Sequence, residues 1–262
     1  MRKIKKVLTI FISILIVFLT NGFTEKVVVS KELKEFKSRG EYIGSQYNNN
    51  FYIVRPKYDY ETCENVYNPF DEYQYIGSTG DIILTSRNPM RYSSSWLIKN
   101  VANFFSKNFF VGHSTLVLTD DGAVMAEITA HTITDGDQQS DNEGVKIVLN
   151  DWINSDDGSE YILGLRGKNL TEENKKKMIK YVYDNQGKKY NYTFLFFRKN
   201  RYYCTDLVSR AYKAAGINVN YDYLVTTGND MIVSNNTYLI FCREKVVKNG
   251  IEEYNIYYLS EE

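Results

Sequence analysis

A turn of three residues, Asp120-Asp121-Gly122, separates two apolar stretches and decides how they pair. If Gly122 takes the left-handed conformation of a three-residue hairpin loop, Thr119 faces Ala123 across the strands. Strand side chains alternate between two faces, so a shift of one residue moves every side chain to the opposite face. The three-residue loop gathers the apolar side chains on one face, and a two-residue loop splits them. The gathered set is Leu116, Leu118, Val124, Ala126 and Ile128. The pattern therefore predicts an antiparallel hairpin with the three-residue loop.

The same register brings a histidine and a glutamate together on the second face of the hairpin. Thr115 faces Glu127, so His113 and Glu127 become diagonal neighbours with backbones roughly 7–8 Å apart. A carboxylate beside an imidazole fixes its tautomer and supports its charged form. The chain has only one other histidine, His131, and we expect a surface or substrate-binding role for it rather than metal binding. We therefore expect His113 to act as a general base that Glu127 orients.

A cysteine supplies the group that such a base would activate. Cys204 stands at the start of a predicted helix that runs to about Ala215, and Gly216 is its expected stop. Backbone N–H groups in the first turn of a helix lack helical partners, so they favour a thiolate and can donate to an oxyanion. A Cys and a His that are far apart in sequence then indicate a nucleophile assembled by the fold.

The neighbours of the cysteine have expected roles of their own. We expect Tyr203 and Thr205 to contribute to the oxyanion and substrate contacts, and Asp206 to complement the helix dipole rather than act as the base. Taken singly, a cysteine on a helix is usually a small buried apolar residue, and a histidine on a strand is usually structural. Their combination with Glu127 in register favours catalysis over packing.

Short predicted strands and helices occur together along the chain in an α+β pattern. We expect strands near residues 80–84, 113–118, 123–129, 145–149, 161–165, 237–247 and 254–259, and helices over 92–110, 171–184 and from Cys204. In the first of these helices, apolar residues recur at helical spacing and are expected to pack in the core; they are Trp96, Leu97, Val101, Phe104 and Phe105. The pattern predicts an antiparallel sheet or half-barrel with helices packed against it.

The N-terminal residues differ from the rest of the chain. Four basic residues precede an apolar run at residues 7–19, and the whole segment 1–22 is typical of a signal peptide. The run is short for a membrane span, and an uncleaved anchor is the alternative. Both interpretations place the folded part outside the cytoplasm, as a secreted or membrane-anchored protein. Residues 23–75 are expected to form an extension, with a short helix over 30–38, that packs on a domain at 76–262.

The charge balance, the cysteines and the acidic loop limit which partners, disulfides and metals the sequence supports. The chain has 32 basic and 32 acidic residues, so no overall field indicates binding to nucleic acid or to an anionic membrane. Cys63 and Cys242 form a disulfide in one interpretation, but we favour three free thiols. The acidic segment 131–144 lacks the spacing of a calcium loop, so we expect a solvated loop and no metal or cofactor.

Several stretches resemble the YiiX-like, circularly permuted branch of the NlpC-type papain-like cysteine hydrolases. They are Gly80-Asp81-Ile82-Ile83-Leu84, Val111-Gly112-His113-Ser114-Thr115-Leu116-Val117-Leu118, Val124-Met125-Ala126-Glu127, Gly144-Val145-Lys146-Ile147, Tyr190-Asn191-Tyr192 and Tyr203-Cys204-Thr205-Asp206-Leu207-Val208. The resemblance spans about residues 76–245. The order His, acid, Cys is what permutation produces, because unpermuted relatives place the Cys first. Thr205 departs mildly from the pattern, since many relatives have Ser there.

The resemblance implies a papain-like fold with Cys204 as nucleophile, His113 as general base and Glu127 as third member. It implies hydrolysis or transfer at an amide, a thioester or an ester, because the wider superfamily cleaves cell-wall peptides and permuted members include lipid acyl-transferring enzymes. We expect an exported cysteine amidase or peptidase that acts on cell-wall peptide. The alternatives are a lipid-acting acyltransferase or esterase with the same triad, whose aromatic segment 192–197 would line a pocket, and a non-catalytic binding module.

Overall fold

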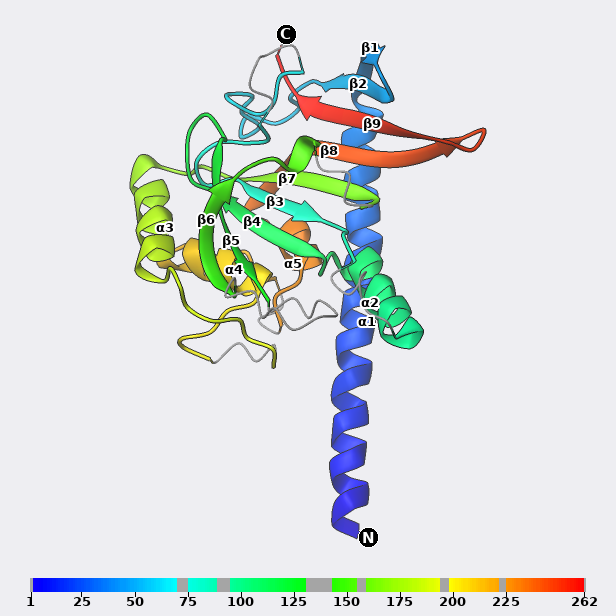
Figure 1. The fold of residues 1–262 in the computed structure, drawn as a ribbon, viewed down its shortest axis with the longest axis vertical. Coiled ribbons are helices and arrows are strands. Elements are labelled where there is room, and N and C mark those ends of the chain that lie inside the picture. The colour runs from blue at the N-terminus through cyan, green and yellow to red at the C-terminus, as the bar shows by residue number, and fades with distance from the viewer. Residues whose placement is uncertain are drawn as a thin grey trace, which may run out of the picture.

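Nine strands form one sheet within the residues that the computed structural model describes, which are 2–69, 75–88, 95–130, 143–154, 159–193, 198–221 and 225–261 (Figure 1). Within residues 2–18 it describes side chains only for Thr9 and Ser13. The strand order is β1-β2-β9-β8-β7-β3-β4-β5-β6. Neighbouring strands are antiparallel, except that β2 and β9 run parallel.

The strands are β1 (Gly40–Gln46), β2 (Asn49–Val54), β3 (Ile82–Thr85), β4 (His113–Val117), β5 (Val124–Thr129), β6 (Gly144–Leu149), β7 (Tyr161–Gly167), β8 (Thr237–Lys248) and β9 (Ile251–Leu259). The helices are α1 (Arg2–Ser38), α2 (Trp96–Phe109), α3 (Glu172–Asp184), α4 (Cys204–Ala214) and α5 (Gly228–Val233), with a short 3-10 turn, η1, at Trp152–Asn154. The α+β prediction is confirmed, and the predicted strands from β3 onward are present.

The N-terminal part differs from the expectation in two ways. The short helix expected over residues 30–38 is the end of the 37-residue helix α1, and β1 and β2 extend the sheet through β9. β1 is largely exposed and β2 is half-buried, and neither has the alternation of apolar and polar residues that would have revealed a strand. Residues 23–54 therefore contribute both a helix and strands to the folded body.

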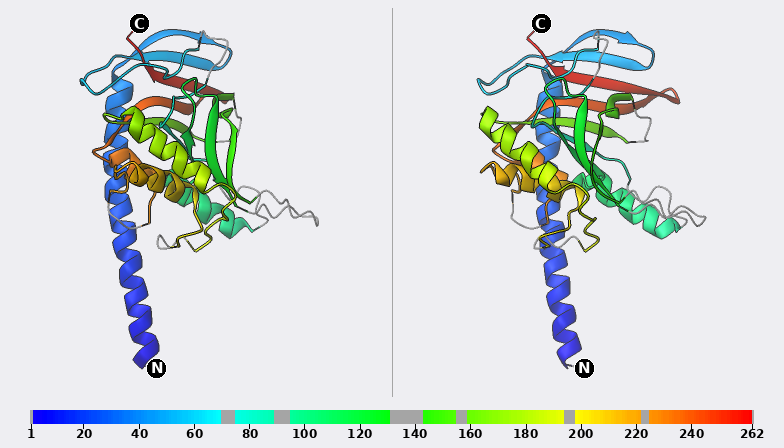
Figure 2. Two further views of the ribbon diagram at one scale, coloured as in Figure 1. Left: turned by 90° about the vertical axis from the view of Figure 1, so that its left-hand side faces the viewer. Right: turned by 60° about the vertical axis from the view of Figure 1, so that its left-hand side comes forward.

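Helix α1 has two parts with different surroundings. Its C-terminal part packs on the body through Val29, Leu33 and Phe36, which are buried. Its N-terminal part extends away from the rest of the chain (Figures 1 and 2). Among the residues whose side chains the structure describes, no helix is long and apolar enough to cross a membrane.

The prediction that the apolar residues of helix 92–110 pack in the core is wrong for most of α2. Four of the five apolar residues named for the core are exposed: Trp96 by 76%, Leu97 by 63%, Val101 by 47% and Phe104 by 45%. Only Ser106 and Phe109, in the last turn, are buried. The spacing predicted the helix correctly, but the apolar stripe faces outward, because only the C-terminal end of α2 packs against the body.

The β4–β5 hairpin has the predicted register. Leu116 pairs with Ala126 and Val117 with Met125, and Gly122 has a φ of 74° in the left-handed region. The hydrogen bond from Gly122 N–H to Thr119 carbonyl, 3.0 Å long, closes the loop. The second face of the hairpin is buried as well as the first, so this part of the sheet lies inside the molecule.

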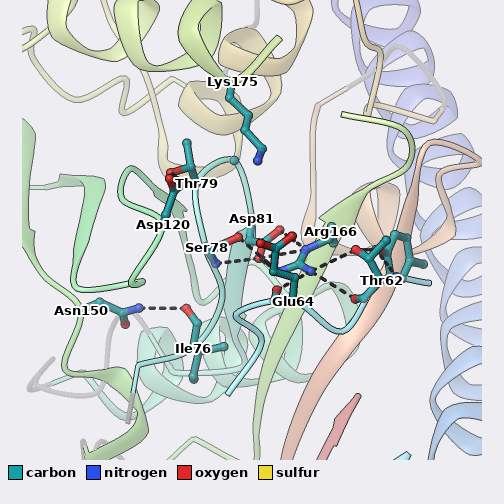
Figure 3. Close-up of polar contacts among 12 residues, drawn as sticks. Thr62, Glu64, Ile76, Ser78, Thr79, Asp81, Asp120, Asn150, Arg166 and Lys175 are labelled. Atoms are coloured by element: carbon teal, nitrogen blue, oxygen red, sulfur yellow. Dashed lines mark hydrogen bonds and ion pairs between the residues drawn. The ribbon is translucent and has the colours of Figure 1, made fainter. Parts of the chain in front are cut away.

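A buried ion pair fixes the start of β3 to β7 (Figure 3). Arg166 Nη2 lies 2.7 Å from Asp81 Oδ2, and its side chain is 10% exposed. Arg166 also donates to the carbonyl oxygens of Thr62 and Glu64, at 3.1 and 2.8 Å. The Arg166 guanidinium therefore links β7 to the loop before β3 and to the segment that follows β2. This network stabilises β3, which is the strand that pairs with β4.

Candidate active site

Cys204 is the first residue of α4, as the sequence predicted. Tyr203, which precedes it, is extended and makes no side-chain cap bond, so the first turn of the helix stays open toward the sulfur. The helix docks through an apolar face, and Leu207 packs with Ile128 and Val145 on strands β5 and β6. Docking of α4 against β4 and β5 brings the cysteine to the strands that carry the other two predicted residues.

His113 lies between an acid and a thiol. Its Nε2 atom is 2.8 Å from Glu127 Oε2. Its side chain also interacts with Cys204, and Nδ1 is the ring nitrogen that the bond to Glu127 leaves for the sulfur. The structure therefore brings all three side chains together, with His113 between the other two. Their side chains are largely buried: His113 is 15% exposed, Glu127 16%, and Cys204 as a residue 7%.

The sulfur is surrounded by donors. Burial disfavours the thiolate, but the His113 side chain and the backbone N–H groups of Thr205 and Ser114 outweigh burial and lower the pKa of Cys204. The Thr205 donor comes from the first turn of α4, which is the effect expected at a helix N-terminus. The Ser114 donor comes from β4, directly after His113, and sequence reasoning gave no sign of it.

The pKa shifts of His113 and Glu127 both favour a charged imidazolium beside an ionised carboxylate. Burial opposes the imidazolium, but hydrogen bonds to Cys204 and Glu127 outweigh it and raise the pKa of His113 to about 10. Burial would raise the pKa of Glu127, but the bond to His113 and the charges of His113 and Lys146 lower it. The arrangement therefore stabilises a thiolate–imidazolium pair next to an ionised glutamate.

Tyr203 and Thr205 have structural contacts that the sequence did not indicate. The Tyr203 hydroxyl accepts a hydrogen bond from Thr226 N–H at 3.0 Å, and the Thr205 hydroxyl donates to the Thr226 carbonyl at 2.6 Å. Both side chains thus hold the segment before α5 against α4. Asp206 pairs with Arg210 at 2.7 Å, and burial raises its pKa to about 6.

Two aromatic residues that sequence reasoning did not place in the site lie beside it. The Trp152 ring in η1 is 5.5 Å from the His113 ring, centroid to centroid. Its indole N–H is buried and has no hydrogen-bond partner within the described residues. Tyr190 packs against the cluster that contains Cys204. The only sequence signals were the position of Trp152 three residues after β6 and the Tyr190-Asn191-Tyr192 motif, to which no role was assigned.

Several sequence predictions fall elsewhere. His131, the loop through residue 142, and the aromatic residues 194–197 lie outside the described residues. Cys63 and Cys242 are free, in agreement with the favoured interpretation, and so is Cys204. Across the described part of the chain, no three His, Cys, Asp or Glu side chains group in a way that would hold a metal ion.

Comparison with known families adds an independent finding. A family model described as "Permuted papain-like amidase enzyme, YaeF/YiiX, C92 family" matches residues 78–247. The chain belongs to this family. The C92 family match confirms the expected resemblance, the permuted papain-like fold and the class of cysteine hydrolase. It covers all of the strands and helices that carry His113, Glu127 and Cys204.

Structural comparison finds a similar solved structure. The crystal structure of the metalloprotein YiiX from Escherichia coli O157:H7 is similar to the chain, with a TM-score of 0.44 and 18% sequence identity. The similarity covers 63% of this chain and 96% of that chain. No curated protein matches the chain in sequence.

Proposed function

We propose that this C92 family member is an exported cysteine amidase or peptidase in which Cys204 is the nucleophile, His113 the general base and acid, and Glu127 the residue that orients the imidazole. The grouping of Cys204, His113 and Glu127, in which His113 bonds Glu127 and interacts with the sulfur, carries the proposal. The alternative of a non-catalytic module requires a sulfur that lies far from His113 or is sealed from solvent. The interaction between Cys204 and His113 argues against the first condition, and the reactivity of the Cys204 thiol, which is 7% exposed as a residue, tests the second.

The geometry supports a two-step hydrolysis. The thiolate of Cys204, whose proton resides on His113, attacks the carbonyl carbon of the amide and forms a tetrahedral intermediate. The Cys204 backbone N–H, at the helix start, is the proposed donor to the oxyanion. The His113 imidazolium then gives its proton to the leaving amine, which departs and leaves a thioester on Cys204. Water, deprotonated by His113, attacks this thioester, and the acid product leaves with the thiolate and imidazolium restored.

Glu127 and Trp152 shape the base in this scheme. Glu127 accepts a hydrogen bond from Nε2–H throughout and stays ionised, so Nδ1 stays directed at the sulfur and the charged imidazole is stabilised. The Trp152 ring lies beside the imidazole ring, with centroids 5.5 Å apart.

Cell-wall peptide is the proposed substrate, and the signal-peptide pattern of residues 1–22 supports a location outside the cytoplasm, secreted or held by residues 7–19. The second candidate is acyl transfer or ester hydrolysis on lipid by the same three residues. It is favoured by the exposed apolar face of α2, because α2 ends at Phe109, four residues before His113.

Incubation with purified muropeptides and, separately, with labelled phospholipid tests the proposal. The intact chain should release peptide fragments from muropeptides, Cys204→Ala should lose about 10³-fold or more of the rate, and Cys63→Ala should keep it. Cleavage of phospholipid alone would favour the second candidate. Full activity of folded Cys204→Ala on either substrate would overturn the catalytic assignment.

A further inference from the structure

The first three turns of α2 stand out from the body with apolar side chains in solvent. Trp96, Leu97 and Ile98 are exposed by 76%, 63% and 50%, and Val101 and Phe104 by 47% and 45%. A soluble surface seldom gathers this many large apolar side chains on one helix, and such patches usually mark an interaction site. We name these five residues the α2 apolar face.

The α2 apolar face lies beside the point where α1 leaves the body. Phe23 of α1 packs edge-on against Phe104 and Phe109, with ring centroids 6.2 and 5.8 Å apart. Gly22 allows this approach, because a Cβ atom there would lie 2.4 Å from the Phe109 ring. Phe23 is itself 43% exposed, so apolar surface continues from α2 onto α1.

The two helices point to the same side of the molecule. The N-terminal part of α1 projects beyond the body at the end where α2 lies (Figures 1 and 2). This projecting part contains the apolar run at residues 7–19. A partner that bound the projecting part of α1 would therefore also lie next to α2.

Local charge favours an anionic partner, although the chain as a whole is neutral. Residues 1–24 contain four basic residues and no acid, and α2 contains Lys99 and Lys107 and no acid. Lys107 is paired with Glu160, while Lys99 lies exposed within the first two turns of α2. A helix with exposed Trp and aliphatic residues and Lys as its only charge is typical of helices that lie in the interface of an anionic bilayer.

We propose that the α2 apolar face is a membrane-docking surface that inserts into the interface of an anionic lipid bilayer beside the projecting part of α1. The helix that carries the docked surface leads directly into the candidate active site, because Phe110, Val111 and Gly112 alone separate α2 from His113. Docking would therefore hold His113 and Cys204 near the lipid surface. The proposal does not depend on the catalytic assignment, since its test measures only the surroundings of α2.

Tryptophan fluorescence tests docking directly, because the chain has two tryptophans and only Trp96 is exposed. We expect vesicles of phosphatidylglycerol and phosphatidylcholine to shift the emission to shorter wavelength and to protect it from acrylamide. Brominated lipids in the same vesicles should quench it. Trp96→Phe, which retains buried Trp152, should show none of these changes. Protein that sediments with the vesicles while Trp96 stays open to acrylamide would overturn the proposal, because α1 alone would then be the anchor.

Matched double variants test whether the fluorescence shift on vesicles depends on the α2 apolar face. Leu97→Gln with Ile98→Gln should abolish the spectral shift on vesicles, whereas Val247→Gln with Ile251→Gln, equally exposed in β8 and β9, should preserve it. A full shift in the first double variant would contradict the assignment. An equal shift on pure phosphatidylcholine would contradict the anionic partner, and a shift that grows with protein concentration without lipid would replace the bilayer with a second copy of the chain.

Discussion

His113 and Glu127 lie on neighbouring antiparallel strands, with His113 Nε2 2.8 Å from Glu127 Oε2. The hairpin register alone places them on one face, and the bond between them leaves the opposite ring nitrogen for Cys204. A loop one residue shorter between β4 and β5 would break this relationship. The hairpin turn is thus as important to the site as the three side chains.

Glu127→Gln should retain a hydrogen-bonding side chain but remove the negative charge. We expect kcat to fall roughly 10²- to 10⁴-fold, because the amide no longer supports the imidazolium or fixes its tautomer. Steady-state kinetics on the substrate that the muropeptide and phospholipid incubations select measure this. Glu253→Gln, a surface carboxylate that pairs with Lys248, is the control and should leave kcat unchanged. A Glu127→Gln enzyme within twofold of the intact chain would show that Glu127 has no orienting role.

The pH dependence of kcat/KM should form a broad bell. The thiolate is lost as pH falls through the lowered pKa of Cys204, so the acid limb lies below the usual thiol value of 9.0. The imidazolium is lost as pH rises through the raised pKa of His113, so the basic limb lies at about 10. In Glu127→Gln the basic limb should move to lower pH, since one of the bonds that raises this pKa is gone. A basic limb near 6.5, the ordinary histidine value, would contradict the paired state.

Gly112→Ala should displace the start of β4. A Cβ atom there would lie 2.4 Å from the backbone oxygens of both Thr85 and Arg87, so His113 cannot keep its position. We expect a loss of about 1–3 kcal/mol in unfolding free energy together with a large fall in kcat. Gly250→Ala, at a left-handed turn with open space, should cost stability without affecting kcat. Equal kcat values for the two variants would show that the close approach at Gly112 does not position His113.

Arg166→Met should leave Asp81 as a buried carboxylate without its partner. We expect unfolding free energy to fall by about 3–5 kcal/mol, measured by urea denaturation, because an uncompensated charge remains in the interior. Arg55→Met, on the surface, should change it by less than about 0.5 kcal/mol. A loss no larger than that of Arg55→Met would mean that the Asp81–Arg166 pair does not hold β3 to β7.

Much of this fold and site followed from local sequence patterns. The register at Gly122, the helix expected over 171–184 and the helix start at Cys204 depend on short-range chemistry, and each is present as predicted. The outward-facing stripe of α2 was predicted wrongly, because helical spacing shows that one face is apolar but not what covers it. The Ser114 donor and the Trp152 contact arise from tertiary packing between distant segments, which no local pattern encodes.

Alkylation of the three thiols by iodoacetamide across a range of pH tests the central claim most directly, with mass spectrometry to separate the sites. Burial raises the pKa of Cys63 to about 11 and of Cys242 to about 12, so these two are internal controls. The account predicts that Cys204 reacts at a pH below 9.0, where the controls are inert, and that His113→Asn returns it to the pH dependence of an ordinary thiol. A Cys204 that reacts no faster than Cys63 at that pH, or whose reactivity is unchanged by His113→Asn, would contradict the thiolate–imidazolium pair.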